Sequence, residues 1–111
     1  MQLMTQNKLK ILVRDFSISP GPRYISEGPW SGEKFRTEFL EPELKKAISE
    51  DKKLVIDLDG TLGYGTSWLE EVFGGLIRTG FNLDEINKYL ELISTEESYL
   101  LDDINEYLKD A

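Results

Sequence analysis

Alternating hydrophobic and polar residues predict the first strand of this chain. Residues 8–16 (KLKILVRDF) carry apolar side chains at Leu9, Ile11 and Val13, which is the period of a β-strand. Residues 1–7 precede this pattern and are expected to be flexible. Residues 53–58 (KLVIDL) are a compact apolar run, typical of a strand that is buried on both faces. Residues 90–94 (LELIS) predict a further strand.

A loop and a helix are predicted between the first two of these strands. Residues 17–32 (SISPGPRYISEGPWSG) hold prolines and glycines in quick succession, which indicates a loop. Within it, residues 23–26 are a candidate edge strand that returns against the first strand. Ser31 is a suitable N-cap for a helix that extends to about Asp51. Pro42 lies inside this helix and predicts a kink or two abutting helices.

Three more helices are predicted in the second half of the chain. The first begins with Thr66 as its N-cap, ends near Gly80 and carries an apolar stripe. Gly74-Gly75 inside it costs about 1 kcal/mol per glycine relative to alanine, so we expect close approach to a sheet or another helix. Residues 82–89 predict a short helix, and Thr95 is expected to cap a final helix through Lys109. The order of elements predicts an α/β fold, with helices packed on a small mixed β-sheet in one domain from residue 8 to 111.

Composition limits the chemistry of the chain. The formal net charge of −8 disfavours binding to nucleic acid through phosphate neutralisation. The sequence has no cysteine and no histidine, which excludes thiolate metal sites, histidine zinc ligands and the ordinary catalytic triads. No apolar run reaches the roughly 18 residues of a membrane span, and MQLMTQNKLK lacks the apolar core of a signal peptide. We therefore expect a cytoplasmic protein without a metal, cofactor, nucleic-acid or membrane partner.

An acidic motif follows the central predicted strand and has two interpretations. The letters IDLDGT, from Ile56 to Thr61, resemble the nucleophile motif of the haloacid-dehalogenase phosphohydrolases. That resemblance implies Asp57 as the nucleophile beside Mg²⁺ and Asp59 as the acid/base. The rest of that family's pattern is not found in order, because no lysine stands between Ser94-Thr95 and Asp102-Asp103. The plainer interpretation is that both carboxylates form a turn by accepting hydrogen bonds from backbone amides.

A longer set of motifs resembles a different family. The chain has a Gly-Glu-x-Phe-Arg helix start at residues 32–36, a proline in the first helix, an Asp-Leu-Asp-Gly turn at 57–60, the hydroxyl pair Thr66-Ser67 and Phe-Gly-Gly-Leu at 73–76. Together these features resemble the STAS domains, which are anti-sigma-factor antagonists, and more closely the STAS-like domain family of unknown function. The resemblance covers roughly residues 18 to 80.

This resemblance implies partner switching without catalysis. STAS domains dock on a histidine-kinase-like (GHKL-type) ATPase, which phosphorylates a hydroxyl at a helix N-terminus and so abolishes docking. The matching phosphoacceptors here are Thr66 and then Ser67, although Gly65 and Trp68 depart from the acidic and small neighbours of the family pattern. The expected docking surface is the 59–68 loop with the helix after it, and its contacts are Asp59, Thr61, Tyr64, Trp68, Glu70 and Glu71.

Two further hypotheses remain open on the sequence. Arg23, in the glycine-rich loop, is a candidate contact for an anion. The acidic final helix or the edge of the N-terminal strand is a candidate surface for self-association. A binding module that serves a defence or immunity partner is a related alternative to the kinase-like one.

Overall fold

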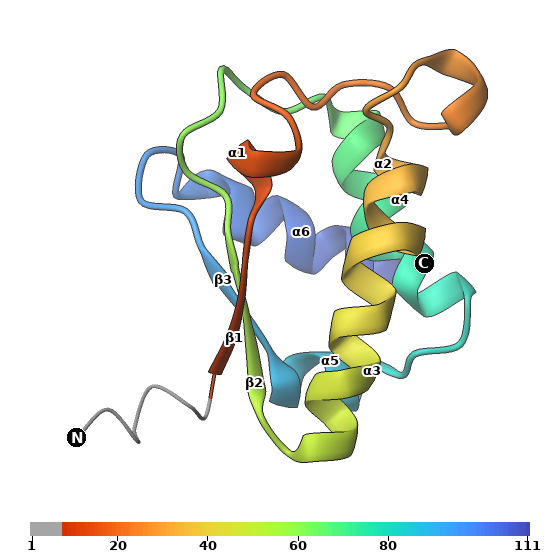
Figure 1. The fold of residues 1–111 in the computed structure, drawn as a ribbon, viewed down its shortest axis with the longest axis vertical. Helices are drawn as coiled ribbons and strands as arrows, with labels where there is room; N and C mark the ends of the chain where they lie inside the picture. The colour runs from red at the N-terminus through yellow and green to blue at the C-terminus, as the bar shows by residue number, and fades with distance from the viewer. Residues whose placement is uncertain (1–7) are drawn as a thin grey trace.

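Three parallel strands form the sheet in the part of the chain that the structure describes. The structure is a computed structural model that describes residues 8–111 (Figure 1), and the segment 1–7, expected to be flexible, lies outside the described residues. Strand β1 spans Lys8–Leu12, β2 spans Lys53–Asp57 and β3 spans Leu90–Ile93. Their order is β1-β2-β3, and both pairings are parallel. The predicted α/β fold with helices on a small sheet is confirmed.

Strand β2 lies in the middle of the sheet and supplies the sheet's part of the core. Leu54 and Ile56 are 0% exposed and belong to one hydrophobic cluster with residues of the helices. The strand register places neighbouring residues of β1 and β3 on the same face, namely Leu9, Ile11, Leu90 and Leu92. Since parallel strands end at the same edge of a sheet, the segments that follow the three strands come together there.

Strand β1 is shorter than predicted. It ends at Leu12, and a single helical turn, α1 (Val13–Phe16), follows it. Val13 continues the alternation of the strand, but its side chain is 0% exposed and lies in the core of the protein. The backbone N–H of Ser17 donates to the carbonyl of Val13 (3.0 Å) and closes the turn. The prediction of a strand therefore fails after Leu12, because the chain closes a helical turn there while the side chain of Val13 still reaches the core.

Residues 23–26 do not form the predicted edge strand. The 3₁₀ helix η2 (Ile25–Glu27) takes their place, because Oε1 of Glu27 accepts hydrogen bonds from the backbone N–H groups of Arg23 and Tyr24 (3.0 Å each). Without this strand, the expected antiparallel neighbour of β1 is missing among the described residues, and the described sheet is parallel instead of mixed.

The helix predicted around Pro42 is a continuous run of three segments. It consists of α2 (Gly32–Lys34), the π-helical segment η3 (Phe35–Leu40) and α3 (Glu41–Glu50). Ser31 caps the run as predicted, since its Oγ accepts from the backbone N–H of Lys34 (3.0 Å). Pro42 stands at the start of α3, and a proline cannot supply an interior N–H bond. In place of the expected kink, the helix has a π-helical segment, η3, directly before α3.

Helices α4 (Thr66–Arg78), α5 (Leu83–Tyr89) and α6 (Tyr99–Asp110) complete the fold. Figure 1 shows the α2–α3 run and α4 on one side of the sheet. The final helix starts later than predicted, because the backbone N–H and hydroxyl of Thr95 bind Asp59 and do not cap a helix. Among residues 8–111, no helix combines the length and hydrophobicity needed to cross a membrane.

Candidate functional site

The carboxyl end of β2 continues into an acidic turn. Asp57 is buried, and its Oδ1 accepts a hydrogen bond from the backbone N–H of Asp59 (3.0 Å). Its Oδ2 lies 3.3 Å from Nη1 of Arg14, which also donates to the backbone carbonyl of Asp59 (3.1 Å). Arg14 follows β1, so the parallel pairing of β1 and β2 brings these residues together. The carboxylate of Asp57 therefore shapes the turn by accepting a backbone amide, as the plainer interpretation predicts.

Asp59 joins this turn to the loop between β3 and α6. Its Oδ1 accepts from the backbone N–H groups of Thr95 (2.9 Å) and Glu96 (3.0 Å), and its Oδ2 accepts from the Thr95 hydroxyl (2.5 Å). In return, Oε1 of Glu96 accepts from the backbone N–H of Gly60 (2.8 Å). The hydrogen bonds from Glu96 and Thr95 lower the pKa of the Asp59 carboxyl. Both of its oxygens are engaged within the chain, so Asp59 fixes the turn.

The same geometry bears on the phosphohydrolase alternative. A nucleophilic aspartate must present a free carboxylate oxygen to its substrate. Here one oxygen of Asp57 accepts the amide of Asp59, and the other faces Arg14. Within residues 8–111, no three Asp or Glu side chains are grouped so that they could hold a metal ion. The arrangement gives the phosphohydrolase alternative no support.

The loop between β2 and α4 presents an apolar tip. Leu62 is 81% exposed. Its backbone N–H donates to the carbonyl of Ile18 (2.7 Å), and Ile18 is itself 56% exposed. Thr61, a predicted contact, precedes this tip and is partly exposed. Two segments that are far apart in sequence thus form one exposed apolar pair at the carboxyl end of the sheet.

Tyr64 and Trp68 support this loop from within. The hydroxyl of Tyr64 donates to the carbonyl of Leu58 (2.7 Å), and burial raises the pKa of that hydroxyl. Its ring lies 5.6 Å from the ring of Trp68. Trp68 is 0% exposed, and its Nε1 donates to the carbonyl of Trp30 (3.1 Å). The expectation that Trp68 is an exposed partner contact is therefore wrong, because its ring fills the core between α4 and the preceding loop.

The N-cap of helix α4 lies one residue before the predicted cap, Thr66. Gly65 is the N-cap, and Thr66 is the first residue of the helix. The Gly65 position lies against the backbone of the 17–31 loop, where an added Cβ would stand 3.0 Å from the carbonyl oxygen of Gly21. Thr66 and Ser67 are both exposed. Their hydroxyls are therefore accessible on the first turn of α4, directly after the apolar tip.

Glu70 and Glu71, both predicted partner contacts, bind arginines of their own chain. Glu70 accepts from Arg78 (2.7 Å) and Arg23 (2.6 Å), and its hydrogen bond with Arg78 is the main reason that its pKa is lowered. Arg23 also lies 3.4 Å from Glu71. This pairing corrects the expectation of an anion contact at Arg23, because its charge is already balanced by two carboxylates.

Glu71 lies deeper and pairs with Arg36. Its Oε2 accepts from Nη1 of Arg36 (2.6 Å), and both residues are 7% exposed. Arg36 also donates to the backbone carbonyl of Glu71 (2.8 Å) and to Glu41 (2.9 Å). Burial lowers the pKa of Arg36, but the hydrogen bonds with Glu71 and Glu41 outweigh it, so the pKa is raised. Because it is buried and paired, Glu71 cannot contact a partner directly.

Comparison with known proteins identifies the family of this chain. A family model described as the STAS-like domain of unknown function (DUF4325) matches residues 31–100. The chain belongs to this family. No curated protein and no solved structure matches it. The family predicted from the sequence motifs is therefore confirmed.

Two motifs of this STAS-like chain meet at one helix interface. An added Cβ at Gly32 would lie 2.7 Å from the backbone oxygen of Trp68 on α4. Gly75 leaves the space that the guanidinium of Arg36 occupies. The segments 32–36 and 73–76 are thus the two sides of the contact between the α2–η3 run and α4. The close approach predicted from Gly74-Gly75 is confirmed at Gly75.

Several residues of the site were not predicted from the sequence. Arg14 lies in the segment expected to be strand, and Glu96 lies in the segment expected to be the start of the final helix. Ile18 and Leu62 belong to loops without a periodic pattern. Parallel pairing of β1 and β2 is the property that would have pointed to these residues, because it brings the segments after both strands to the same edge of the sheet.

Proposed function

We propose that this STAS-like domain is a regulatory module that binds a protein partner and does not catalyse a reaction. Its docking surface is the loop 58–65 together with the first turn of α4. The observation that carries the proposal is Leu62, which is 81% exposed beside the exposed Ile18. Exposed apolar side chains at a fixed loop tip favour a protein interface.

The internal hydrogen bonds of the loop support this surface. The Asp57–Arg14 and Asp59–Thr95 contacts hold both ends of the acidic turn. Tyr64 ties the loop back to Leu58. A preorganised loop loses less conformational entropy on binding than a mobile one.

The family resemblance suggests a GHKL-type ATPase as the partner and phosphorylation as the control. Thr66 and Ser67 are exposed at the start of a helix of 13 residues, where the helix dipole accommodates an added phosphate. A phosphate adds about 1.5 to 2 negative charges. Placed directly after the apolar tip, this charge would repel an acidic partner face. An ATP-dependent partner agrees with the cytoplasmic location expected from the sequence.

The proposal is tested with a partner captured on the immobilised full chain and then purified. Leu62→Asp should weaken its affinity by about tenfold or more, since it places a charge at the centre of the contact. Ile25→Asp is the matched control, because Ile25 is 51% exposed on η2 and away from the tip. Equal affinities of the two variants would reject this docking surface. Incubation with the partner and ATP, followed by mass spectrometry, tests phosphorylation of Thr66 and Ser67.

A further inference from the structure

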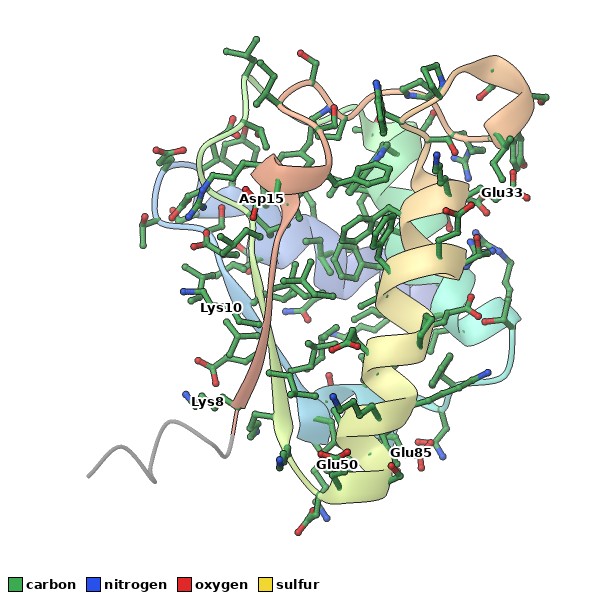
Figure 2. The ribbon with its side chains drawn as sticks, in the orientation of Figure 1. Lys8, Lys10, Asp15, Glu33, Glu50 and Glu85 are labelled. Atoms are coloured by element: carbon green, nitrogen blue, oxygen red, sulfur yellow. The ribbon has the colours of Figure 1, made fainter. Side chains whose placement is uncertain are left out.

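A second surface lies along the outer edge of β1. It is a groove of about 360 Å³ between the strand and the α2–η3 run. One wall is formed by residues 10–12 of β1 and by α1. The other wall is aromatic and includes Trp30, Phe35 and Phe39. Figure 2 shows Lys8 and Lys10 beside β1, with Asp15 on α1 beyond them. None of these residues belongs to the loop 58–65.

The groove follows the edge of the strand and not one of its faces. Lys10, Ile11 and Leu12 all line it, although successive side chains of a strand point to opposite faces. In the described sheet, β1 pairs with β2 alone. Alternate peptide groups of such an edge strand point away from its neighbour and are ready to pair with another chain. Within residues 8–111, no turn, loop or side-chain hydrogen bond uses the backbone of residues 8–11, whereas Leu12 is the N-cap of α1.

The opposite wall is a packed set of aromatic rings. The ring of Phe16 meets Trp30, Phe35 and Phe39 edge-on, at centroid distances of 5.6, 5.3 and 5.4 Å. Trp30 is nevertheless 50% exposed and Phe39 is 44% exposed. Aromatic side chains that are fixed by packing yet exposed are typical anchors of a binding surface.

The charges along the groove favour an acidic occupant. Nζ of Lys34 lies 5.2 Å from the centroid of the Trp30 ring, and Lys10 stands on the strand side. Neither lysine has an ion-pair partner within residues 8–111, whereas Lys8 is paired with Glu91. The chain as a whole carries a net charge of −8, so an unpaired lysine on each side of this strand edge, Lys34 beside Trp30 and Lys10 on the opposite face, makes the edge locally basic. Asp15 gives the α1 end of the groove the opposite sign.

We propose that this groove binds an extended peptide segment of a partner protein, which adds a strand to the edge of β1. Its backbone pairs with the outward peptide groups of residues 8–11, and alternate apolar side chains pack on Trp30 and Phe39. Acidic side chains between them point to the opposite face of the added strand, where Lys10 stands. A second copy of this chain fits less well, since full-length antiparallel pairing of two β1 strands places Lys10 opposite Lys10, and like charges that face each other destabilise a sheet.

The test uses a fluorescent peptide in which valine and phenylalanine alternate with glutamate, with anisotropy as the readout. The full chain should bind it saturably, and Trp30→Ala and Phe39→Ala should each weaken binding by about tenfold. Tyr99→Ala, which removes a 57% exposed ring on α6, and Leu62→Asp should leave binding unchanged. The peptide with lysine in place of glutamate, or with N-methyl groups on alternate amides, should bind at least about tenfold less tightly. Circular dichroism checks that each variant is folded.

Three outcomes would overturn the proposal. The first is absence of saturable binding, and the second is an equal loss with Tyr99→Ala and Trp30→Ala. The third is that the peptide binds only to a variant that carries Leu3→Ser and Met4→Ser together. That result would mean that the chain's own N-terminal segment occupies the groove. Leu62→Asp should weaken binding of the partner to the docking loop and leave binding of the peptide to the groove unchanged. Either proposal can therefore fail without the other.

Discussion

Nη1 of Arg36 lies 2.6 Å from Oε2 of Glu71 in the interface between η3 and α4. Arg36 belongs to the motif at 32–36, Glu71 stands just before the motif at 73–76, and the missing side chain of Gly75 leaves room for the guanidinium. This buried pair holds α4, and therefore the first turn with Thr66, against the rest of the domain. The stability of the domain and the position of the docking loop depend on the same contact.

Glu71→Gln should destabilise the fold strongly. It leaves the buried guanidinium of Arg36 with Glu41 as its remaining carboxylate partner, and removal of one member of a buried ion pair costs about 3–5 kcal/mol. Urea unfolding followed by circular dichroism measures the change. Glu91→Gln is the matched control, because it breaks the exposed Lys8–Glu91 pair, and exposed pairs contribute at most about 1 kcal/mol. Similar losses in both variants would contradict the structural role of the Arg36–Glu71 pair.

The two adjacent glycines of α4 should respond differently to alanine. At Gly75, an added Cβ collides with the buried guanidinium of Arg36, so Gly75→Ala should destabilise by about 1–3 kcal/mol despite its better helix propensity. At Gly74, the Cβ meets only the ends of the Glu70 and Arg78 side chains, which can move. Gly74→Ala should therefore be neutral or stabilising by up to about 1 kcal/mol. Thermal unfolding of both variants measures this contrast, and the reverse order would show that Gly75 is not required for close approach.

Asp59 should contribute stability that depends on pH. Its pKa is lowered in the folded chain by hydrogen bonds from Glu96 and Thr95, so the unfolded chain binds the proton more tightly. The contribution is fully present above the ordinary pKa of 3.8 and is lost as the pH falls through the lower, folded value. Asp59→Asn should therefore be less stable than the wild type at pH 7, and the difference should shrink below about pH 4.

Urea midpoints at several pH values measure this effect. Asp110→Asn, at the exposed end of α6, is the control and should leave the midpoint at pH 7 unchanged. If the stability difference between Asp59→Asn and the wild type stays constant down to pH 2, the hydrogen bonds from Thr95 and Glu96 do not lower the pKa of Asp59 in the folded chain.

Thr66→Glu should separate folding from docking. A carboxylate in the first turn of a helix interacts favourably with the helix dipole and stabilises by about 0.3–1 kcal/mol. The same charge beside Leu62 imitates a phosphate and should weaken partner binding. Thr66→Ala is the uncharged control and should keep binding. Thermal unfolding and partner affinity, measured on the same samples, should therefore change in opposite directions for Thr66→Glu, and a joint loss would indicate misfolding.

Much of the fold followed from hydrophobic periodicity. The central strand, the helix with the Gly74-Gly75 pair and the element order were predicted because long apolar stripes leave few alternatives. The errors occurred where side-chain hydrogen bonds or burial outweigh the local pattern. Glu27 winds residues 25–27 into a 3₁₀ turn, and Asp59 takes Thr95 away from its expected cap.

The candidate site was less predictable than the fold. Its position after β2 followed from the glycine-rich acidic turn, but the exposure of its residues did not. Trp68 lies at the rim of an apolar stripe, and only the carbonyl of Trp30 and the neighbouring rings show that it is buried. Leu62 carries no periodic signal, since its exposure results from a loop conformation fixed by Ile18 and Tyr64.

Site-specific photo-crosslinking in the native cell tests the central claim most directly. A photoreactive amino acid replaces Leu62 in the full chain, and a matched chain carries it at Lys46, which is exposed on α3. The account predicts a discrete protein adduct from position 62, none from position 46, and loss of the adduct when Thr66→Glu is added. Identical adducts from both positions, or no adduct from position 62, would contradict a docking surface at the carboxyl end of the sheet.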